Sequence, residues 1–452
     1  MTGFLFSGGG SSSVTSTGST TARTTQDRFA EVHNVRDFGA VGTGLVDDHA
    51  AIQACIDWVA GTERGVIFFP AGEYLIASPL TFNELASHSI IFRGVGRASH
   101  IYGNFAGFLL DRSITGGGNW SIDIIENLWF QNGSSNPASG AIRWNSCQGF
   151  AVRNCQITGY TGIGCYDSCF TTTIQNCSFA SIGGTVVGTA GVYFFGGGGS
   201  VIQACDFMGW HDGILLRTGA AVIGCRFENC GNGIQLYEAA GSSIISCGGE
   251  ANDCMIWARN YQKCFIAFCE HNGHAAAPYS GYGAGGSGPI VGDTLLWSTY
   301  GFVAGDGTRN IWLNCTAHAD ASTASYNGAG IKMTADAGTY HGLQPHNRWI
   351  SCQANNGGVA YTGSTTKWDI GAGAMAQNTF EDCTPADPEV NRVFADMVSA
   401  PTLGMEATIK DGRRASDNAA LTTAMWGTTV IGGGASKCRI LYNGTNWTLM
   451  GL

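Results

Sequence analysis

Two glutamates occupy matching positions in a repeating part of this 452-residue chain and could act together as an acid and a base. Glu228 lies three residues after Cys225, and Glu250 lies three residues after Cys247, in segments that share one pattern. If these segments stack as neighbouring β-strands, the two glutamate Cα atoms lie about 5 Å apart. Two carboxyl groups this close favour a state with one protonated acid and one ionised base.

The distance between two carboxyl groups distinguishes the two kinds of glycoside hydrolysis. Retaining glycosidases hold their carboxyl groups about 5–5.5 Å apart, and inverting ones about 6.5–9.5 Å. Glu228 and Glu250 suit the shorter distance, and Asp253, on the same turn as Glu250, could supply the longer one. The alternative for all three is an ordinary acidic surface, on which the side chains point apart and are only hydrated.

Aromatic and basic side chains form a second set at repeated positions. Arg217, Tyr237 and Arg259 each lie twelve residues after a cysteine of the repeat, and Trp257 lies ten residues after one. Aromatic rings stack on sugar rings, and arginine pairs with the carboxylates of acidic sugars. The set therefore predicts a surface that binds an acidic polysaccharide. The alternative is a contact between subunits, where Tyr, Trp and Arg are equally at home.

A histidine-containing segment, Glu270-His271-Asn272-Gly273-His274, offers a different chemistry. His271 or His274 could remove the proton beside the carboxylate of a uronic acid, which is the proton transfer that β-elimination needs. The alternative is that both histidines are polar residues of a turn.

The elements that would position these residues are short β-strands in a repeat of 20–22 residues. Cys205, Cys225 and Cys247 each precede an isoleucine by nine residues, and successive cysteines are 20 and 22 residues apart. β-rich repeats of this length without a helix predict a β-solenoid, in which each repeat is one rung and the cysteines face inward. A leucine-rich repeat would need leucine-rich units, which the chain lacks.

The composition supports many short strands and argues against several classes of protein. Glycine numbers 68, charged residues make up 12% and hydrophobic residues 44%, which suits a packed chain with many tight turns. The net charge of −10 argues against nucleic-acid binding, and no run of about 18 apolar residues predicts a membrane span. The 17 cysteines include no CxxC pair, so we expect reduced, buried thiols and neither a metal nor a cofactor.

The chain divides into three parts by composition. Residues 1–27 are rich in Gly, Ser and Thr and predict a flexible anchoring segment without the basic region of a secretory signal. Residues 28–395 carry the predicted solenoid. Residues 396–452 predict a small C-terminal β domain, in which Asn443-Gly444 between β-prone runs indicates a hairpin.

One helix, at residues 47–60, is predicted to cap the start of the solenoid. Asp47 and Asp48 supply an N-cap and negative charge at its first turn, and Gly61 can end it. Its apolar stripe follows the helical period and consists of Ile52, Cys55, Ile56 and Val59.

The segment Val35–Gln53, Val-Arg-Asp-Phe-Gly-Ala-Val-Gly-Thr-Gly-Leu-Val-Asp-Asp-His-Ala-Ala-Ile-Gln, and the later Val66–Tyr74 resemble the entry segment of the pectate-lyase-like superfamily. This superfamily includes polysaccharide hydrolases and lyases and the tailspikes of bacteriophages. The resemblance implies an all-β fold, a right-handed parallel β-helix, and it does not fix a reaction. Thr43 stands where the family commonly has Asp, and the Gly-His-Gly motif of polygalacturonases is absent.

The layout of a short N-terminal segment, a β-helix and a small C-terminal β domain resembles a phage tailspike. The resemblance implies a homotrimer in the virion tail, made in the host cytoplasm and attached to tail or baseplate proteins through its N-terminus. It implies recognition and depolymerisation of a capsule, exopolysaccharide or O-antigen by glycoside hydrolysis or β-elimination. The alternatives are a non-catalytic glycan-binding protein, a purely structural tail protein, or a free bacterial enzyme, which should carry an export signal.

Overall fold

The computed structural model describes most residues from 31 to 272 and separate segments on either side of them. The chain forms two compact units, Met1–Ser178 and Phe179–Leu452. The described residues are 13–15, 18, 20–24, 31–62, 64–82, 89–112, 122–136, 138–166, 169–182, 188–250, 252, 254–259, 261–272, 302–304, 307–319, 331–333, 346–356, 368–370, 379–381, 383, 406–414, 430–442 and 447–451.

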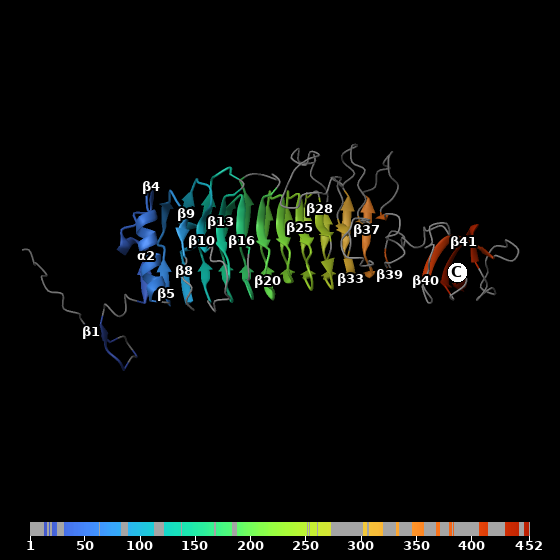
Figure 1. The fold of residues 1–452 in the computed structure, drawn as a ribbon, viewed down its shortest axis with the longest axis horizontal. Coiled ribbons are helices and arrows are strands. Elements are labelled where there is room, and N and C mark those ends of the chain that lie inside the picture. The colour runs from blue at the N-terminus through green and yellow to red at the C-terminus, as the bar shows by residue number, and fades with distance from the viewer. Residues whose placement is uncertain are drawn as a thin grey trace, which may run out of the picture. The chain divides into compact units, whose positions relative to one another are not determined.

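In the first unit, short strands follow one another around each rung, and equivalent strands of successive rungs pair in parallel (Figure 1). We call the resulting sheets the first-, second- and third-strand sheets, after the order of the strands along a rung. The first-strand sheet contains β3 (Val32–Asn34), β5 (Arg64–Phe68), β8 (Ser89–Arg93), β11 (Ile124–Glu126), β14 (Ala151–Arg153) and β17 (Thr173–Gln175). The second-strand sheet contains β4 (Thr43–Asp47), β6 (Gly72–Leu75), β9 (Ser99–Gly103), β12 (Trp129–Asn132) and β15 (Gln156–Gly159). The third-strand sheet contains β7 (Leu80–Thr81), β10 (Phe108–Arg112), β13 (Gly140–Trp144) and β16 (Thr161–Cys165).

The second unit has the same three kinds of strand, and β18 (Ser178–Ser181) falls at its start. Its first strands are β20 (Ser200–Gln203), β23 (Ala220–Ile223), β26 (Ser243–Ile245), β30 (Phe265–Ala267), β33 (Gly307–Leu313), β36 (His346–Ile350) and β39 (Thr379–Glu381), with β29 (Tyr261–Gln262) also paired to β33. Its second strands are β21 (Asp206–Met208), β24 (Arg226–Glu228), β27 (Gly248–Glu250), β31 (Glu270–Asn272), β34 (Thr316–Ala319) and β37 (Gln353–Asn356). Its third strands are β19 (Ala190–Phe194), β22 (Asp212–Leu216), β25 (Asn232–Tyr237), β28 (Cys254–Arg259), β32 (Phe302–Ala304), β35 (Ile331–Met333) and β38 (Trp368–Ile370).

The pairing confirms the predicted parallel β-helix and the register of its repeat. Ile214 pairs with Ile234, and Ile234 pairs with Ile256, as the constant spacing from the cysteines predicts. All three isoleucines are fully buried, so equivalent residues of successive rungs form one column inside the second unit.

A two-residue corner joins the first and second strands of each regular rung. Its first residue has a left-handed backbone, as at Asn154 (φ 51°), Ala204 (φ 50°) and Ser246 (φ 53°). Asparagine tolerates this conformation better than most residues, which explains why it recurs before cysteine. The second corner residue is a buried, free cysteine whose Sγ donates to backbone carbonyl oxygens. The predicted inward column is therefore confirmed, with Cys155 and Cys177 in the first unit and Cys205, Cys225, Cys247, Cys269, Cys315 and Cys352 in the second.

Stacked aromatic rings fill the interior of the second unit. Phe207 lies nearly parallel to Phe179 and Phe227, at centroid distances of 4.5 and 5.0 Å. A Cβ atom at Gly213 would lie 2.6 Å from Phe227 Cδ1, so only glycine leaves room for this column. Gly213 therefore faces the core.

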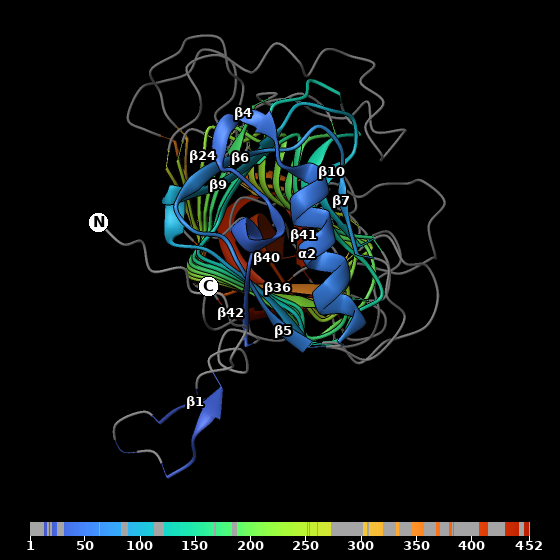
Figure 2. The same ribbon diagram turned by 90° about the vertical axis from the view of Figure 1, so that its left-hand side faces the viewer.

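Among the described residues, α2 (His49–Gly61) is the only α-helix, beside the short 3-10 helices η1 (Val35–Phe38) and η2 (Gly96–Ala98). It packs against β3, β5 and β7 at the start of the first unit (Figure 2). Asp48 holds the N-cap position and the helix ends at Gly61, as predicted. The Asp48 carboxylate, however, accepts hydrogen bonds from the N–H groups of Val41 and Gly42 and not from the helix. The predicted apolar stripe is confirmed, because its members are all fully buried: Ile52, Cys55, Ile56 and Val59.

Two small antiparallel sheets lie outside the rungs. Near the N-terminus, β1 (Ser13–Val14) pairs with β2 (Arg23–Thr24). Near the C-terminus, β40 (Glu406–Arg414), β41 (Val430–Tyr442) and β42 (Trp447–Gly451) form a three-stranded sheet. The pairing of β41 with β42 agrees with the predicted hairpin, whose tip at 443–444 lies outside the described residues. The boundaries predicted at residues 27 and 395 stay predictions.

Candidate functional site

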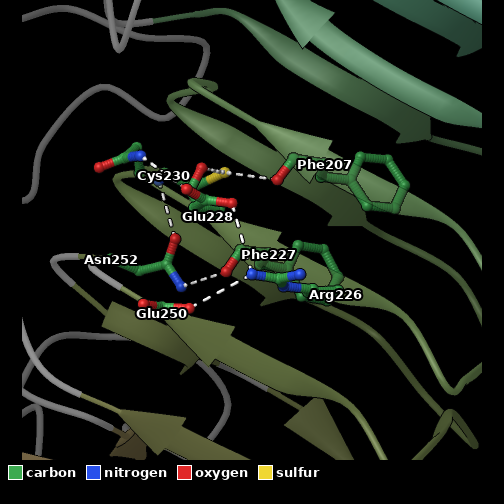
Figure 3. Close-up of polar contacts among 8 residues, drawn as sticks. Phe207, Arg226, Phe227, Glu228, Cys230, Glu250 and Asn252 are labelled. Atoms are coloured by element: carbon green, nitrogen blue, oxygen red, sulfur yellow. Dashed lines mark hydrogen bonds and ion pairs between the residues drawn. The ribbon is translucent and has the colours of Figure 1, made fainter.

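Glu228 and Glu250 lie side by side in the second-strand sheet of the second unit (Figure 3). Glu228 ends β24, Glu250 ends β27, and the two are direct register partners. The preceding residues Phe227 and Gly249 face the core, so both glutamates point outward. The predicted adjacency of the two glutamates is confirmed, and their catalytic role stays a prediction.

Arg226 joins the two carboxylates into one charged group. Its Nη2 atom lies 3.6 Å from Glu228 Oε2 and 3.3 Å from Glu250 Oε2. The side chains of Glu228 and Glu250 are 41% and 63% exposed, so solvent screens all three charges. The shared cation offsets the repulsion between the two acids, and the same arrangement is common in surface ion-pair networks.

Buried contacts beneath the pair hold the turn between β24 and β25. Asn252 Oδ1 accepts a hydrogen bond from the Cys230 N–H at 2.8 Å, and Asn252 Nδ2 donates to the Phe227 carbonyl at 3.0 Å (Figure 3). Burial raises the pKa of the Cys230 thiol to about 12, so it stays protonated and is no nucleophile at neutral pH. Asp253, the third predicted acid, lies outside the described residues. The wider carboxylate spacing that it would provide therefore stays a prediction.

The predicted aromatic and basic residues gather at the end of the third strands in the second unit. Tyr237 pairs with Arg259, and Trp257 lies two residues before Arg259 on β28. The structure adds Phe195, which follows β19 and is 44% exposed. We call these five partly exposed residues the aromatic–arginine strip: Phe195, Arg217, Tyr237, Trp257 and Arg259.

Arg217 is held between two aromatic rings of this strip. Its guanidinium carbon lies 4.4 Å from the Phe195 ring centroid and 5.1 Å from that of Tyr237, and the guanidinium also pairs with Glu238. Burial raises the pKa of the neighbouring Tyr193, although Arg217 acts in the opposite direction, so this phenol is neutral at pH 7. An acidic sugar would therefore meet a cation that is already oriented.

The structure brings together the members of each predicted group and places the two groups on different sheets. Glu228 ends a second strand, whereas Tyr237 ends the third strand of the same rung. The spacing from the cysteines predicts neighbours along a column, and it contains no information on the distance between columns.

A buried polar network beside the strip is not evident from the motifs. Asp212 is 5% exposed; its Oδ1 accepts from Asn232 Nδ2 at 2.8 Å, and its Oδ2 lies 2.8 Å from His211 Nδ1. When the side-chain amide of Gln235 is oriented with its nitrogen toward Asp212, that nitrogen donates to Asp212 Oδ1 at 3.0 Å and to Oδ2 at 3.1 Å. Gln235 is the register partner of Trp257, so the network supports the strands that carry the strip. The sequence feature that could have indicated this network is that Asp212 and Asn232 both lie seven residues after a column cysteine.

His271, one of the two suggested bases for β-elimination, does not lie on the surface. It is fully buried, and its Nε2 lies 3.1 Å from the Asn252 carbonyl oxygen. Its register partner is Gly249, a core-facing position, so the strand turns His271 inward. His274 lies outside the described residues. In the part of the chain that the structure describes, no group of three or more His, Cys, Asp or Glu could hold a metal ion, and no helix is long and apolar enough to cross a bilayer.

Comparison of the sequence with known proteins identifies relatives of the solenoid. Residues 32–256 match the family described as rhamnogalacturonase A/epimerase, pectate lyase-like. Mannuronan C5-epimerase AlgE4 of Azotobacter vinelandii is 48% identical over 46 residues, which is 10% of this chain and 8% of that protein. The tail spike protein of Shigella phage Sf6 is 34% identical over 80 residues, which is 18% of this chain and 13% of that protein. The chain therefore matches only a small part of the length of these relatives.

Solved structures with the same fold cover most of the chain. The A-module of AlgE4 aligns with a TM-score of 0.58 and 16% identity, over 78% of this chain and 94% of that chain. A tailspike mutant of E. coli bacteriophage HK620, in complex with a pentasaccharide, aligns with a TM-score of 0.51 and 15% identity, over 80% and 70%. At these identities the likeness concerns the fold. Residues 32–256 therefore resemble the pectate lyase-like family of rhamnogalacturonase A and epimerases, and the parallel β-helix that they begin agrees with this likeness.

Proposed function

We propose that this protein is a phage tailspike that binds a bacterial surface polysaccharide, either a capsule, an exopolysaccharide or an O-antigen. The aromatic–arginine strip carries the proposal. The Tyr237 and Trp257 rings offer apolar faces for sugar rings, and Arg217 and Arg259 offer positive charge for acidic sugars. The tail spike of Shigella phage Sf6 and the pentasaccharide complex of the HK620 tailspike support this class of function.

The proposal includes cleavage of the bound polysaccharide at Glu228 and Glu250. One carboxyl group would protonate the glycosidic oxygen, and the other would attack the anomeric carbon or activate water on the opposite face of the sugar. Asp253 is the alternative second acid if the reaction needs the wider spacing. For β-elimination, His271 is no candidate base, because it faces the core and cannot reach a substrate, so that reaction would depend on His274.

A non-catalytic glycan-binding protein is the second candidate. The position of Arg226 favours it, because one guanidinium shared by two exposed glutamates is also an ordinary surface network. In that case the strip would bind the glycan, and the two glutamates would be dispensable.

The experiment that separates these functions measures the size distribution of surface polysaccharides from a panel of bacterial strains after incubation with the purified protein. Wild type is compared with Glu228→Gln/Glu250→Gln and with the matched control Glu270→Gln, an exposed acid of the same sheet. We expect wild type and the control to shorten the polymer, and the double variant to bind without cutting. Binding without cutting by all three would establish the non-catalytic candidate, and absence of binding would refute the proposal.

The contribution of the strip is tested by direct binding to the same polysaccharides. Trp257→Ala is expected to weaken binding of the polysaccharide by about tenfold to a hundredfold, because one stacking ring is lost. Trp58→Ala, which removes an exposed aromatic side chain from α2 in the first unit, is the matched control. Equal binding by both variants would show that the glycan lies elsewhere.

We also propose that the protein is a homotrimer in the virion tail, made in the host cytoplasm, and that residues 1–27 attach it to tail or baseplate proteins. Sedimentation should give about three times the chain mass of 47.3 kDa. Deletion of residues 1–27 should leave the trimer intact and abolish incorporation into virions. A trimer that dissociates on this deletion would contradict the anchoring role.

A further inference from the structure

The outer face of the first-strand sheet in the second unit is uncharged over several rungs. Every second residue of these strands is fully buried, so the residues between them point outward. In the first-strand segments of these rungs the charged residues are Lys263 and Arg309, and both lie before the paired stretch. We call the outward, partly exposed positions from β20 to β33 the uncharged face: Val201, Gln203, Ala221, Ile223, Ser243, Ile245, Phe265, Ile311 and Leu313.

Phe268, at the corner that ends β30, continues this face with an unfavourable backbone. Its φ is 56° and its side chain is 51% exposed. A bulky residue is disfavoured in the left-handed region, and an exposed aromatic ring adds no stability to its own subunit. A strained, exposed residue of this kind indicates a contact with another molecule. The other regular corners carry smaller residues: Asn127, Asn154, Asn176, Ala204, Gly224, Ser246, Asn314 and Ser351.

We infer that the uncharged face, together with Phe268, is the contact surface between copies of this chain. The inference rests on the homotrimer proposed above and assigns its interface. If copies stand parallel around a common axis, each rung meets the same rung of its partners. In this geometry, a column of Ile, Leu and Phe side chains contacts the same apolar column of the partner copies. A column of charged residues would instead face residues of the same charge.

The charge of the chain favours a second copy as the occupant of this face. Each chain carries a net charge of −10, so association of copies has to overcome electrostatic repulsion. The second-strand sheet would bring acids together, because Glu228, Glu250 and Glu270 point outward there. The uncharged face avoids this repulsion.

The test is sedimentation velocity of the full-length chain over a range of concentrations. Phe268→Asn places at this corner the residue that most regular corners of the first unit carry, so the subunit should be at least as stable as wild type. The dissociation constant of the oligomer should rise about tenfold or more. The matched control is Met208→Asn, because Met208 is also 51% exposed but lies on the second-strand sheet. It should leave the oligomer unchanged.

A second variant, Ile223→Asp/Ile245→Asp, puts like charges on two register partners of the face and should yield monomers. Circular dichroism establishes that each variant is folded. An oligomer that neither variant weakens would overturn the assigned interface and leave the trimer and the glycan proposal intact. A monomeric wild type would overturn the trimer and the interface, and glycan binding by that monomer would still decide the function separately. Lower subunit stability of Phe268→Asn with an unchanged oligomer would show that Phe268 serves its own subunit.

Discussion

The first-strand sheets of the two units are built alike on the inside and differ on the outside. In the first unit, Arg93 and Glu126 are register partners immediately before the corner, and they form an ion pair of 2.6 Å. In the second unit, the register partners immediately before the corner are Ile223 and Ile245. Because both units keep the same buried columns, the inward residues set the fold, and the outward residues are free to determine what the surface contacts.

The comparison predicts equal and large penalties for cavities inside either unit. Phe130→Ala in the first unit and Phe227→Ala in the second each remove a buried ring, so each should lower the free energy of unfolding by about 3–5 kcal/mol. Chemical denaturation followed by circular dichroism measures both values. A much smaller loss for one of them would show that the two interiors are not equivalent.

Close packing of the shared interior predicts an intermediate effect at Gly213. Its added Cβ would lie 2.6 Å from both Phe227 Cδ1 and the Gly233 carbonyl oxygen, so Gly213→Ala should cost about 1–3 kcal/mol of unfolding free energy. Gly248→Ala is the control, because nothing lies within 4 Å of its added Cβ. Equal denaturation midpoints for the two variants would argue against the tight packing of the phenylalanine column.

The corner residues offer a reciprocal test of the strain at Phe268. Asn154 has a φ of 51° in the first unit, so Asn154→Phe should cost about 1–2 kcal/mol of unfolding free energy. Asn154→Gly, which also accepts a positive φ, should cost less. Thermal unfolding of both variants measures the difference. A phenylalanine that is neutral at this position would remove the backbone argument for Phe268.

The smallest expected effect on subunit stability comes from introducing on the second unit an ion pair like the one between Arg93 and Glu126 on the first. Ile223→Arg/Ile245→Glu reproduces on the second unit the pair that Arg93 and Glu126 form on the first. Exposed ion pairs contribute about 0.2–1 kcal/mol, so the unfolding free energy of the isolated subunit should change by less than about 1 kcal/mol. The oligomer should nevertheless dissociate in sedimentation. A large loss of subunit stability would mean that the isoleucines serve the fold.

Sequence reasoning predicted the solenoid, its register and the adjacency of Glu228 and Glu250, because these features depend on position along a repeat. A constant distance from the column cysteine places equivalent residues on neighbouring strands, whatever the turns do. The same arithmetic brought Tyr237 and Arg259 together as register partners.

Other features were not predicted from the sequence, because they depend on side-chain contacts that the spacing of residues does not determine. Arg226 lies one residue after the column cysteine, and nothing in the pattern indicates that it reaches both glutamates. His271 was considered as a base for β-elimination or as a polar turn residue, and the alternation of its strand instead turns it into the core. Asp48 was expected to cap the helix through its side chain, but its carboxylate accepts hydrogen bonds from the backbone N–H groups of residues 41 and 42 instead. Each depends on the direction of a single side chain.

The corner of fixed length between first and second strands has a consequence for how such a protein tolerates insertions and deletions. One left-handed residue and one cysteine fill this corner, so a change of length there would shift the following strand by a residue and reverse its two faces. The connections from second to third strands have no such restriction, since residues 229–231 join β24 to β25 and residues 273–301 join β31 to β32. Recombination between relatives can therefore exchange whole connections on that side while the stack of rungs stays the same, so that the surface changes without refolding of the body of the protein.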